Sequence, residues 1–120
     1  NTFLDFKDFP TTIFTPLEYS SCGMTRNKRS KSLAMIKFTS ITRVSAAGGR
    51  GIKQIRLRGD DYRTSSYIKV ITNLEGKVYG LHYVGPHAGE VMQGYAVAMR
   101  MGLTKQDLER TIGIHPTSAE

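Results

Sequence analysis

Two strand-like runs joined by a short turn constrain the fold of this chain more than any other feature of its sequence. Tyr67–Thr72 and Val78–Val84 are rich in β-branched and aromatic residues, which favour extended backbone. Asn73–Lys77 separates them and contains Asn and Gly, the residues that best tolerate the positive φ of a tight turn. The pattern predicts an antiparallel β-hairpin.

An amphipathic helix is predicted after the hairpin, from about Gly89 to Met101. Apolar residues recur there at three- and four-residue spacing and form one stripe, made up of Val91, Met92, Tyr95, Ala98 and Met99. Gly94 interrupts the pattern at a cost of about 1 kcal/mol relative to alanine. We therefore expect Gly94 to mark the close approach of another backbone.

A second, shorter helix is predicted to follow, after Gly102 has ended the first one. It begins at Thr104, whose hydroxyl can cap the amide of Asp107 three residues later. This helix is expected to carry Leu108 toward the core and to end near Gly113.

The remaining elements complete a prediction of the fold class. Thr11–Thr15 is a predicted strand, Leu17–Gly23 an expected irregular connection, and Met35–Val44 and Ile52–Leu57 are weaker strand candidates. Residues 1–120 are predicted to form a single α+β domain, an antiparallel sheet of about four strands with two or three helices packed against it. The chain stops directly after the polar motif Ile114–Glu120 with no closing element, which suggests truncation there, and we expect the domain to be truncated at both ends.

A single cysteine bears on the compartment of the protein. Cys22 cannot form an internal disulfide and favours a reducing environment, so we expect a cytoplasmic location, with a mitochondrial form as the alternative. No apolar run approaches the roughly 20 residues of a membrane helix, and no membrane partner is expected. The thiol itself is interpreted as partly buried, with a reactive surface cysteine as the alternative.

The net charge of +7 comes from one internal stretch. Between Arg26 and Lys69 there are 12 Lys/Arg and 2 Asp/Glu, whereas the rest of the chain carries −3. A nucleic-acid site combines basic residues with stacking aromatics or a recognition helix. Residues 26–66 contain only two aromatics, Phe38 and Tyr62, and no helical pattern, so no nucleic-acid partner is expected.

Three blocks of the chain resemble a known family. They are Pro10–Met24, which contains the sequence FTPLEY, Gly80–Met101 (GLHYVGPHAGEVMQGYAVAMRM), and Gly102–Glu120 (GLTKQDLERTIGIHPTSAE). Together with the strand from Tyr67 they cover more than half of the chain. The blocks are similar to animal-type thioredoxin reductases and thioredoxin-glutathione reductases of the pyridine nucleotide-disulfide oxidoreductase family.

The resemblance implies the dimerisation (interface) domain of an FAD-containing, NADPH-dependent reductase, a homodimer acting on thioredoxin, glutathione or glutaredoxin. It implies that His115 is the acid/base catalyst for the partner subunit's redox thiols, and that Glu120 accepts its hydrogen bond and holds its tautomer. Pro116, expected to follow a cis peptide bond, and Thr117 would place backbone groups near the partner's flavin. The residue types suit the task, because thiol–disulfide exchange needs a base with a pKa near neutrality.

Other parts of such an enzyme are absent from this sequence. It has no G-x-G-x-x-G motif for a dinucleotide and no C-x4-C redox pair, so the chain alone is expected to bind neither FAD nor NADPH and to be inactive. No metal site is predicted. A glutathione-reductase-like parent and a non-catalytic basic binding module with the same fold stay open as alternatives, although the FTPLEY wording argues against the first.

Residues 26–66 depart from the family pattern, which has an acidic helix and then a strand. We interpret the segment as divergent and hypothesise that it was translated out of frame. Read one nucleotide earlier, permitted codons of Arg26–Lys28 can spell Glu-Glu-Gln, and those of Leu33–Thr42 can spell Phe-Gly-Asp-Asp-Lys-Ile-His-Val-Tyr-His. A solvated basic loop ranks second, and a nucleic-acid-binding patch is a distant third.

Two further histidines receive other interpretations. His82 lies in the alternating pattern of a predicted strand and is expected to be structural. His87 lies in a predicted loop and is given no role.

Overall fold

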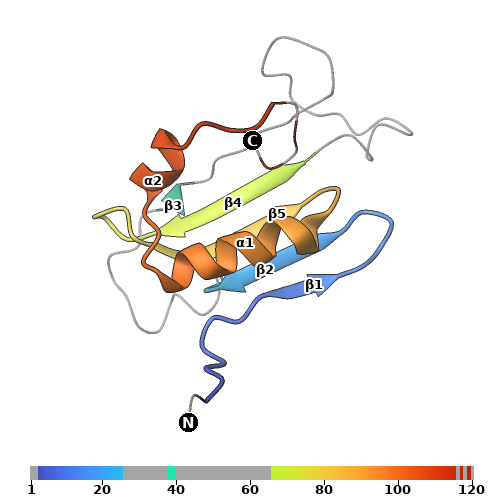
Figure 1. The fold of residues 1–120 in the computed structure, drawn as a ribbon, viewed down its shortest axis with the longest axis horizontal. Helices are drawn as coiled ribbons and strands as arrows, with labels where there is room; N and C mark the ends of the chain where they lie inside the picture. The colour runs from blue at the N-terminus through green and yellow to red at the C-terminus, as the bar shows by residue number, and fades with distance from the viewer. Residues whose placement is uncertain (1–2, 26–37, 40–65, 116, 118, 120) are drawn as a thin grey trace.

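The computed structural model describes residues 3–25, 38–39, 66–115, 117 and 119. Its elements are β1 (Thr11–Ile13), β2 (Tyr19–Gly23), β3 (Phe38–Thr39), β4 (Tyr67–Thr72), β5 (Val78–Val84), α1 (Ala88–Arg100) and α2 (Lys105–Arg110). The strands form one sheet in the order β1-β2-β5-β4-β3, with all neighbours antiparallel (Figure 1). The predicted α+β class is confirmed. Within the described residues the sheet has five strands where about four were expected, and β3 is only two residues long.

The predicted hairpin is confirmed, with both strands at their expected bounds. The turn between β4 and β5 is held by Asn73, whose side-chain oxygen accepts from the amide of Lys77 at 2.8 Å. Gly76 has a φ of 90° and donates its amide to the carbonyl of Asn73 at 3.1 Å. Asn73 therefore holds the turn through its side chain, and Gly76 adopts the positive φ that glycine tolerates best.

Strand β2 corrects the expectation of an irregular connection at Leu17–Gly23. Its small polar residues have low strand propensity, but β1 and β5 pair with it on either side and satisfy its backbone. Ser20 is fully buried, and its hydroxyl donates to the carbonyl of Thr11 at 2.9 Å. Long-range pairing therefore overrides local propensity here. The predicted strand at Thr11–Thr15 is confirmed in part, since β1 ends at Ile13.

Helix α1 covers one face of the sheet, over β2 and β5 (Figure 1). The buried core between these layers consists of Cys22, Val70, Val78, Leu81, Tyr83, Ala88, Met92 and Ala96. Met92, Tyr95 and Met99 of the predicted stripe do face this core. Ala96, at four-residue spacing from Met92, completes the buried face instead of the predicted Ala98. The predicted start is off by one residue, and Gly102, with a φ of 92°, follows the helix as expected.

Gly94 lies on the exposed side of α1. No atom of the described chain lies within 4 Å of the position that a Cβ would occupy there. Among the described residues of one subunit, no backbone makes the expected close approach to Gly94. Contact with a second subunit stays a prediction.

Helix α2 begins as predicted. The hydroxyl of Thr104 accepts from the amide of Asp107, and the Asp107 carboxylate accepts from the amide of Thr104, which completes a capping box. Leu108 is partly buried against the core. The helix ends at Arg110, earlier than the expected Gly113, because Thr111 adopts an extended conformation and its hydroxyl donates to the carbonyl of Asp107 at 2.7 Å.

Several expectations concern residues outside the described part. The interpretation of residues 26–66 as divergent or out of frame falls almost wholly on such residues, as does the strand candidate Ile52–Leu57. Of the candidate Met35–Val44, only β3 is described, and it pairs with β4. Among the described helices, none has the length and apolarity needed to cross a membrane.

Candidate functional site

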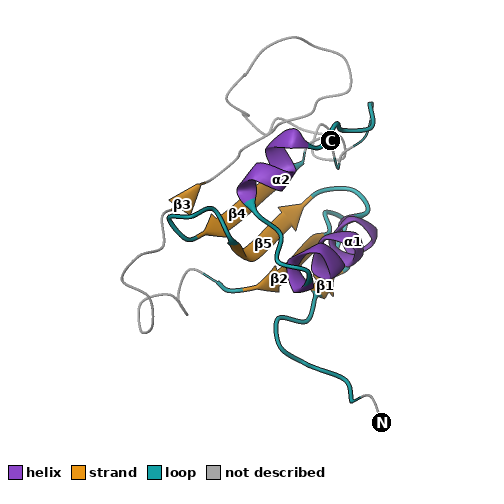
Figure 2. Cartoon of the chain, turned by 60° about the vertical axis from the view of Figure 1, so that its left-hand side comes forward, coloured by secondary structure: helices purple, strands orange, loops and turns teal. Residues whose placement is uncertain are grey.

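The segment after α2 carries the predicted catalytic histidine. It leaves the helix as a loop without regular secondary structure (Figure 2). His115 is exposed to solvent, and so are its apolar neighbours Ile112 and Ile114, which are 93% and 76% exposed. The ring is therefore not enclosed in the core of its own subunit. The two large apolar side chains near it in sequence are not buried by any described residue.

Two hydrogen bonds shape the backbone around His115. The hydroxyl of Thr117 donates to the carbonyl of Ile114 at 2.6 Å, which closes a turn around the histidine. The hydroxyl of Tyr95, on α1, donates to the carbonyl of Ala119 at 3.5 Å and ties the end of the segment to the helix. Burial raises the pKa of Tyr95, and this keeps its hydroxyl a donor.

The structure describes two of the four predicted site residues. His115 and Thr117 lie two positions apart on the same exposed turn. Pro116 and Glu120 lie outside the described residues, so the expected hydrogen bond between His115 and Glu120 stays a prediction. Among the described residues no group of three or more His, Cys, Asp or Glu side chains is arranged to hold a metal ion.

His82 uses both ring nitrogens within the subunit. Nε2 lies 3.0 Å from the carbonyl oxygen of Met24, which can only accept, so Nε2 carries the proton. Nδ1 then accepts from the hydroxyl of Tyr19 at 2.8 Å. The imidazole is 8% exposed, and its burial lowers its pKa, against a smaller opposing effect of the Met24 carbonyl. The neutral ring is a structural bridge between β2 and β5, in line with the expectation from its strand pattern.

This network predicts a loss of stability in mild acid. The unfolded imidazole titrates near its ordinary pKa of 6.5 and the folded one below it. Since the unfolded state binds the proton more readily, the contribution of His82 to stability is complete above pH 6.5 and is lost as the pH falls below that value. Urea unfolding at a series of pH values should show this slope, and His82→Asn should reduce it.

The control for that slope is His87→Asn. His87 is exposed and has a φ of 57°, a left-handed conformation that asparagine tolerates. This substitution should leave the pH dependence unchanged. An equal slope in the wild-type chain and His82→Asn would contradict the assignment.

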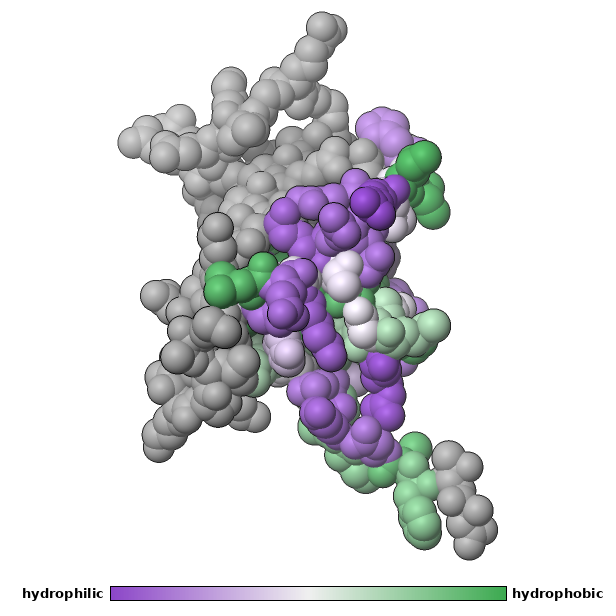
Figure 3. All heavy atoms as spheres, turned by 90° about the vertical axis from the view of Figure 1, so that its left-hand side faces the viewer, coloured by the Kyte–Doolittle hydropathy of each residue, from purple (hydrophilic) through white to green (hydrophobic). Residues whose placement is uncertain are grey.

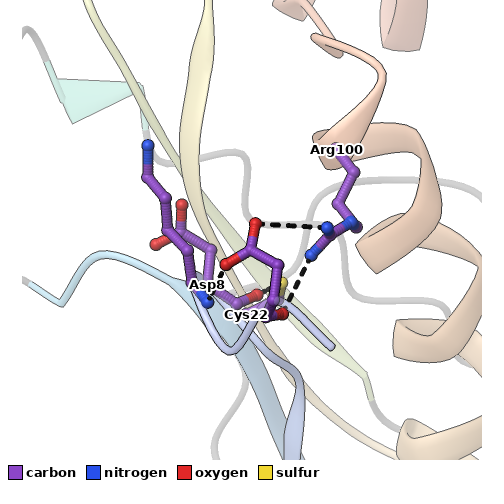
Figure 4. A network of polar contacts seen from close by, with 5 residues as sticks. Asp8, Cys22 and Arg100 are labelled. Carbon is purple, nitrogen blue, oxygen red and sulfur yellow. Dashed lines mark hydrogen bonds and ion pairs between the residues drawn. The ribbon is translucent and has the colours of Figure 1, made fainter. Parts of the chain in front are cut away.

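A second polar cluster joins the N-terminal residues to α1, and sequence reasoning missed it. Arg100 forms an ion pair with Asp5, 95 positions away, at 3.2 Å. No local pattern predicts a contact over such a separation. Cys22, expected to be partly buried, is only 2% exposed and lies beneath this cluster, where its thiol donates to the carbonyl of Asp8 at 2.7 Å (Figure 4).

Comparison with known proteins places the chain in a family. Residues 9–120 match the model of the pyridine nucleotide-disulphide oxidoreductase dimerisation domain. A protein of Plasmodium falciparum called thioredoxin reductase is 35% identical over 127 residues, covering 98% of this chain and 24% of the relative. A protein of Drosophila melanogaster called thioredoxin reductase 2, mitochondrial, is 37% identical over 130 residues, covering 98% of this chain and 22% of the relative.

The extent of these matches decides what they show. The chain spans between a fifth and a quarter of the length of these curated relatives. The matches therefore identify one domain and not a whole enzyme. The match to the domain model covers nearly the whole chain, and its fold is the antiparallel sheet with packed helices that the resemblance implied. The chain therefore belongs to the pyridine nucleotide-disulphide oxidoreductase dimerisation-domain family.

Proposed function

We propose that this chain is the dimerisation domain of an NADPH-dependent, FAD-containing thioredoxin-disulfide reductase. In this role it supplies His115, backed by Glu120, to the dithiol and flavin site of the partner subunit. The observation that carries the proposal is the exposed His115 between Thr117 and the uncovered side chains of Ile112 and Ile114. The names of the relatives favour a thioredoxin reductase over a glutathione-reductase-like parent.

The chemistry assigned to His115 is proton transfer. Thiol–disulfide exchange proceeds through thiolates, so a neighbouring base must take a proton from one thiol and return it to a leaving sulfur. An imidazole has an ordinary pKa close to physiological pH and can do both. Glu120 would stabilise the imidazolium and hold the ring's orientation, as a carboxylate does behind other catalytic histidines.

The cofactors belong to other parts of the proposed parent. The sequence has no glycine-rich phosphate-binding motif, and the described residues show no such loop before either helix. The flavin, when bound in the parent, would supply the electron pair that reduces the redox disulfide to the dithiol. Backbone groups of Pro116 and Thr117 would lie beside the partner's flavin, while the chain alone would bind neither cofactor.

The exposed side of α1 fits contact with the second subunit. Val97 is 54% exposed and Met101 is 84% exposed, one helical turn apart on the outward face. Gly94 precedes Val97 by three positions and would let another backbone come close. Exposed apolar side chains grouped around a glycine are typical of a helix that packs against a partner, and a two-fold homodimer would bury this face.

Location follows the same proposal. The single cysteine favours a reducing compartment, so we place the parent in the cytoplasm. A mitochondrial form is the alternative, because the Drosophila relative carries that word in its name.

A chimera tests the proposed dimer. This chain replaces the matching domain of a full-length thioredoxin reductase, and the product should sediment as a dimer that reduces thioredoxin with NADPH. Val97→Asp should weaken the dimer at least about tenfold and lower activity in parallel at low protein concentration, because an unpaired carboxylate would be buried at the contact. Sedimentation equilibrium measures the dissociation constant.

The matched control places the same charge elsewhere. Leu74 lies in the turn between β4 and β5 and is 63% exposed, so Leu74→Asp should leave the dissociation constant unchanged. A chimera that stays monomeric and inactive, or equal dimerisation of the two variants, would count against the proposal.

A further inference from the structure

The N-terminal residues 3–9 lie across the edge of the core beside the only cysteine of the chain. The carbonyl of Asp8 accepts from the thiol of Cys22 at 2.7 Å, and this thiol belongs to the buried cluster under α1. Figure 4 shows Asp8 directly beside Cys22, with Arg100 reaching toward them from the helix. Access to the sulfur from this side therefore depends on where residues 3–9 lie.

Polar contacts fasten the segment to α1. Arg100, in the last turn of the helix, donates to both the carboxylate and the backbone carbonyl of Asp5, each at 3.2 Å. The other carboxylate oxygen of Asp5 accepts from the amide of Lys7 at 2.9 Å, which holds the segment in a turn. Asp5 thus connects the turn of the segment with the end of the helix.

Apolar burial does little to hold the segment in place. Phe3, Leu4 and Phe6 are 87%, 84% and 72% exposed, and Figure 3 shows this end of the chain projecting as an apolar arm from a largely polar face. The two paired side chains, Arg100 and Asp5, are themselves 52% and 57% exposed, a setting in which ion pairs stabilise weakly. Segments with such contacts open locally without unfolding the domain.

Two features show that the closed position is constrained but not tightly packed. Asp8 has a φ of 54°, a left-handed conformation that costs energy for a residue other than glycine. A cavity of about 390 Å³ lies between the segment, the sheet and α1, with Asp5, Asp8, Tyr79 and Arg100 among its lining residues. The segment therefore borders open space on the side that faces the sheet and α1 and does not pack closely against them.

We propose that residues 3–9 act as a strap, closed over Cys22 by the Asp5–Arg100 ion pair, and that opening of this strap controls access to the thiol. In the closed position the Asp8 carbonyl accepts a hydrogen bond from the thiol of Cys22. Burial raises the pKa of Cys22 in the closed state, with Asp8 adding to the rise and Arg100 opposing it, so the closed thiol is protonated and unreactive. Opening would remove the Asp8 carbonyl from the sulfur and expose the side of the thiol that the segment covers, while the sheet and α1 still pack against its other side. This inference does not depend on the role of His115.

Alkylation of the chain by iodoacetamide tests the strap, because every labelling event reports on Cys22. Each rate is divided by the rate of the same variant unfolded in urea, which cancels differences in intrinsic reactivity. The wild-type chain should label slowly, and Asp5→Asn should label about threefold faster, the effect expected for loss of one exposed pair. About 0.5 M NaCl should accelerate the wild-type chain but not Asp5→Asn, since salt screens only the intact pair.

Glu109→Gln is the matched control. Glu109 pairs with Lys105 on α2, another exposed ion pair, away from the strap, and its loss should leave the labelling rate at the wild-type value. Arg100→Gln provides a second strap variant and should match Asp5→Asn. Low urea concentrations should change the wild-type rate little, since a local opening exposes little surface.

Four results would overturn the strap. Asp5→Asn and Arg100→Gln could label at the wild-type rate, or Glu109→Gln could label as fast as they do. The wild-type rate could also equal that of the urea-unfolded chain or follow global unfolding across the urea series.

Discussion

His115→Gln is expected to lower the rate of thioredoxin reduction by the chimeric enzyme about 10²- to 10⁴-fold, the usual contribution of a positioned acid/base group. Glutamine keeps hydrogen-bonding capacity but cannot carry a proton between sulfurs at neutral pH. Reduction of the flavin by NADPH should proceed at the wild-type rate, because no thiol proton moves in that step. Steady-state assays with thioredoxin measure the overall rate, and stopped-flow measurement of flavin reduction measures the NADPH half-reaction separately.

The control for this variant is His87→Asn, which changes an exposed histidine on the turn before α1. It should retain full activity. Wild-type activity in His115→Gln, or an equal loss in both half-reactions, would contradict the assignment of His115 as the proton carrier.

Mixed dimers decide whether His115 serves its own subunit or its partner. A His115→Gln subunit and a subunit without its redox cysteines are each inactive as homodimers. If the histidine acts across the two-fold axis, the heterodimer has one complete site, and random mixing should restore about a quarter of the wild-type activity. If the histidine acts within its own subunit, mixing should restore none.

Leu81→Ala is expected to have the largest effect on stability, a loss of about 3 kcal/mol in the free energy of unfolding. Leu81 is 0% exposed in the centre of β5, between Cys22 on β2 and Val70 on β4. Truncation would leave a cavity that these paired strands and α1 cannot close, because hydrogen-bonded ladders hold the strands apart. Urea unfolding followed by circular dichroism measures the change.

Leu74→Ala is the matched control, the same chemical change at a turn residue that is 63% exposed. It should change the free energy of unfolding by less than about 0.5 kcal/mol. If the two variants unfold at the same urea concentration, β5 is not at the centre of the core.

Local sequence patterns predicted the hairpin and the helices well. The β4–β5 turn depends on Asn73 and Gly76, and α2 begins with the Thr104 capping box; both act through hydrogen bonds over four residues or fewer. Such features form wherever the residues occur, and the pattern alone predicts them. The catalytic proposal for His115 came from the resemblance of its surroundings to a family, and the structure adds that the ring is exposed.

Other features depend on residues far apart in the chain. Strand β2 was missed because Ser20, Ser21 and Gly23 lack strand propensity and gain their extended conformation from pairing with β1 and β5. The buried face of α1 was assigned to Ala98 instead of Ala96, since the exact rotation of a helix depends on the shape of the sheet that it covers. Pro116 and Glu120 lie outside the described residues.

The sequence by itself determined the α+β class, the hairpin, the presence of both helices, the start of α2 and the family, because these depend on short-range hydrogen bonds and on patterns of residue type. Only the tertiary structure decided that Tyr19 and His82 form a buried bridge, that Arg100 reaches Asp5, and that Cys22 lies beneath residues 3–9. These contacts join segments up to 95 positions apart. Their geometry follows from how the sheet and α1 pack, and no local pattern carries that information.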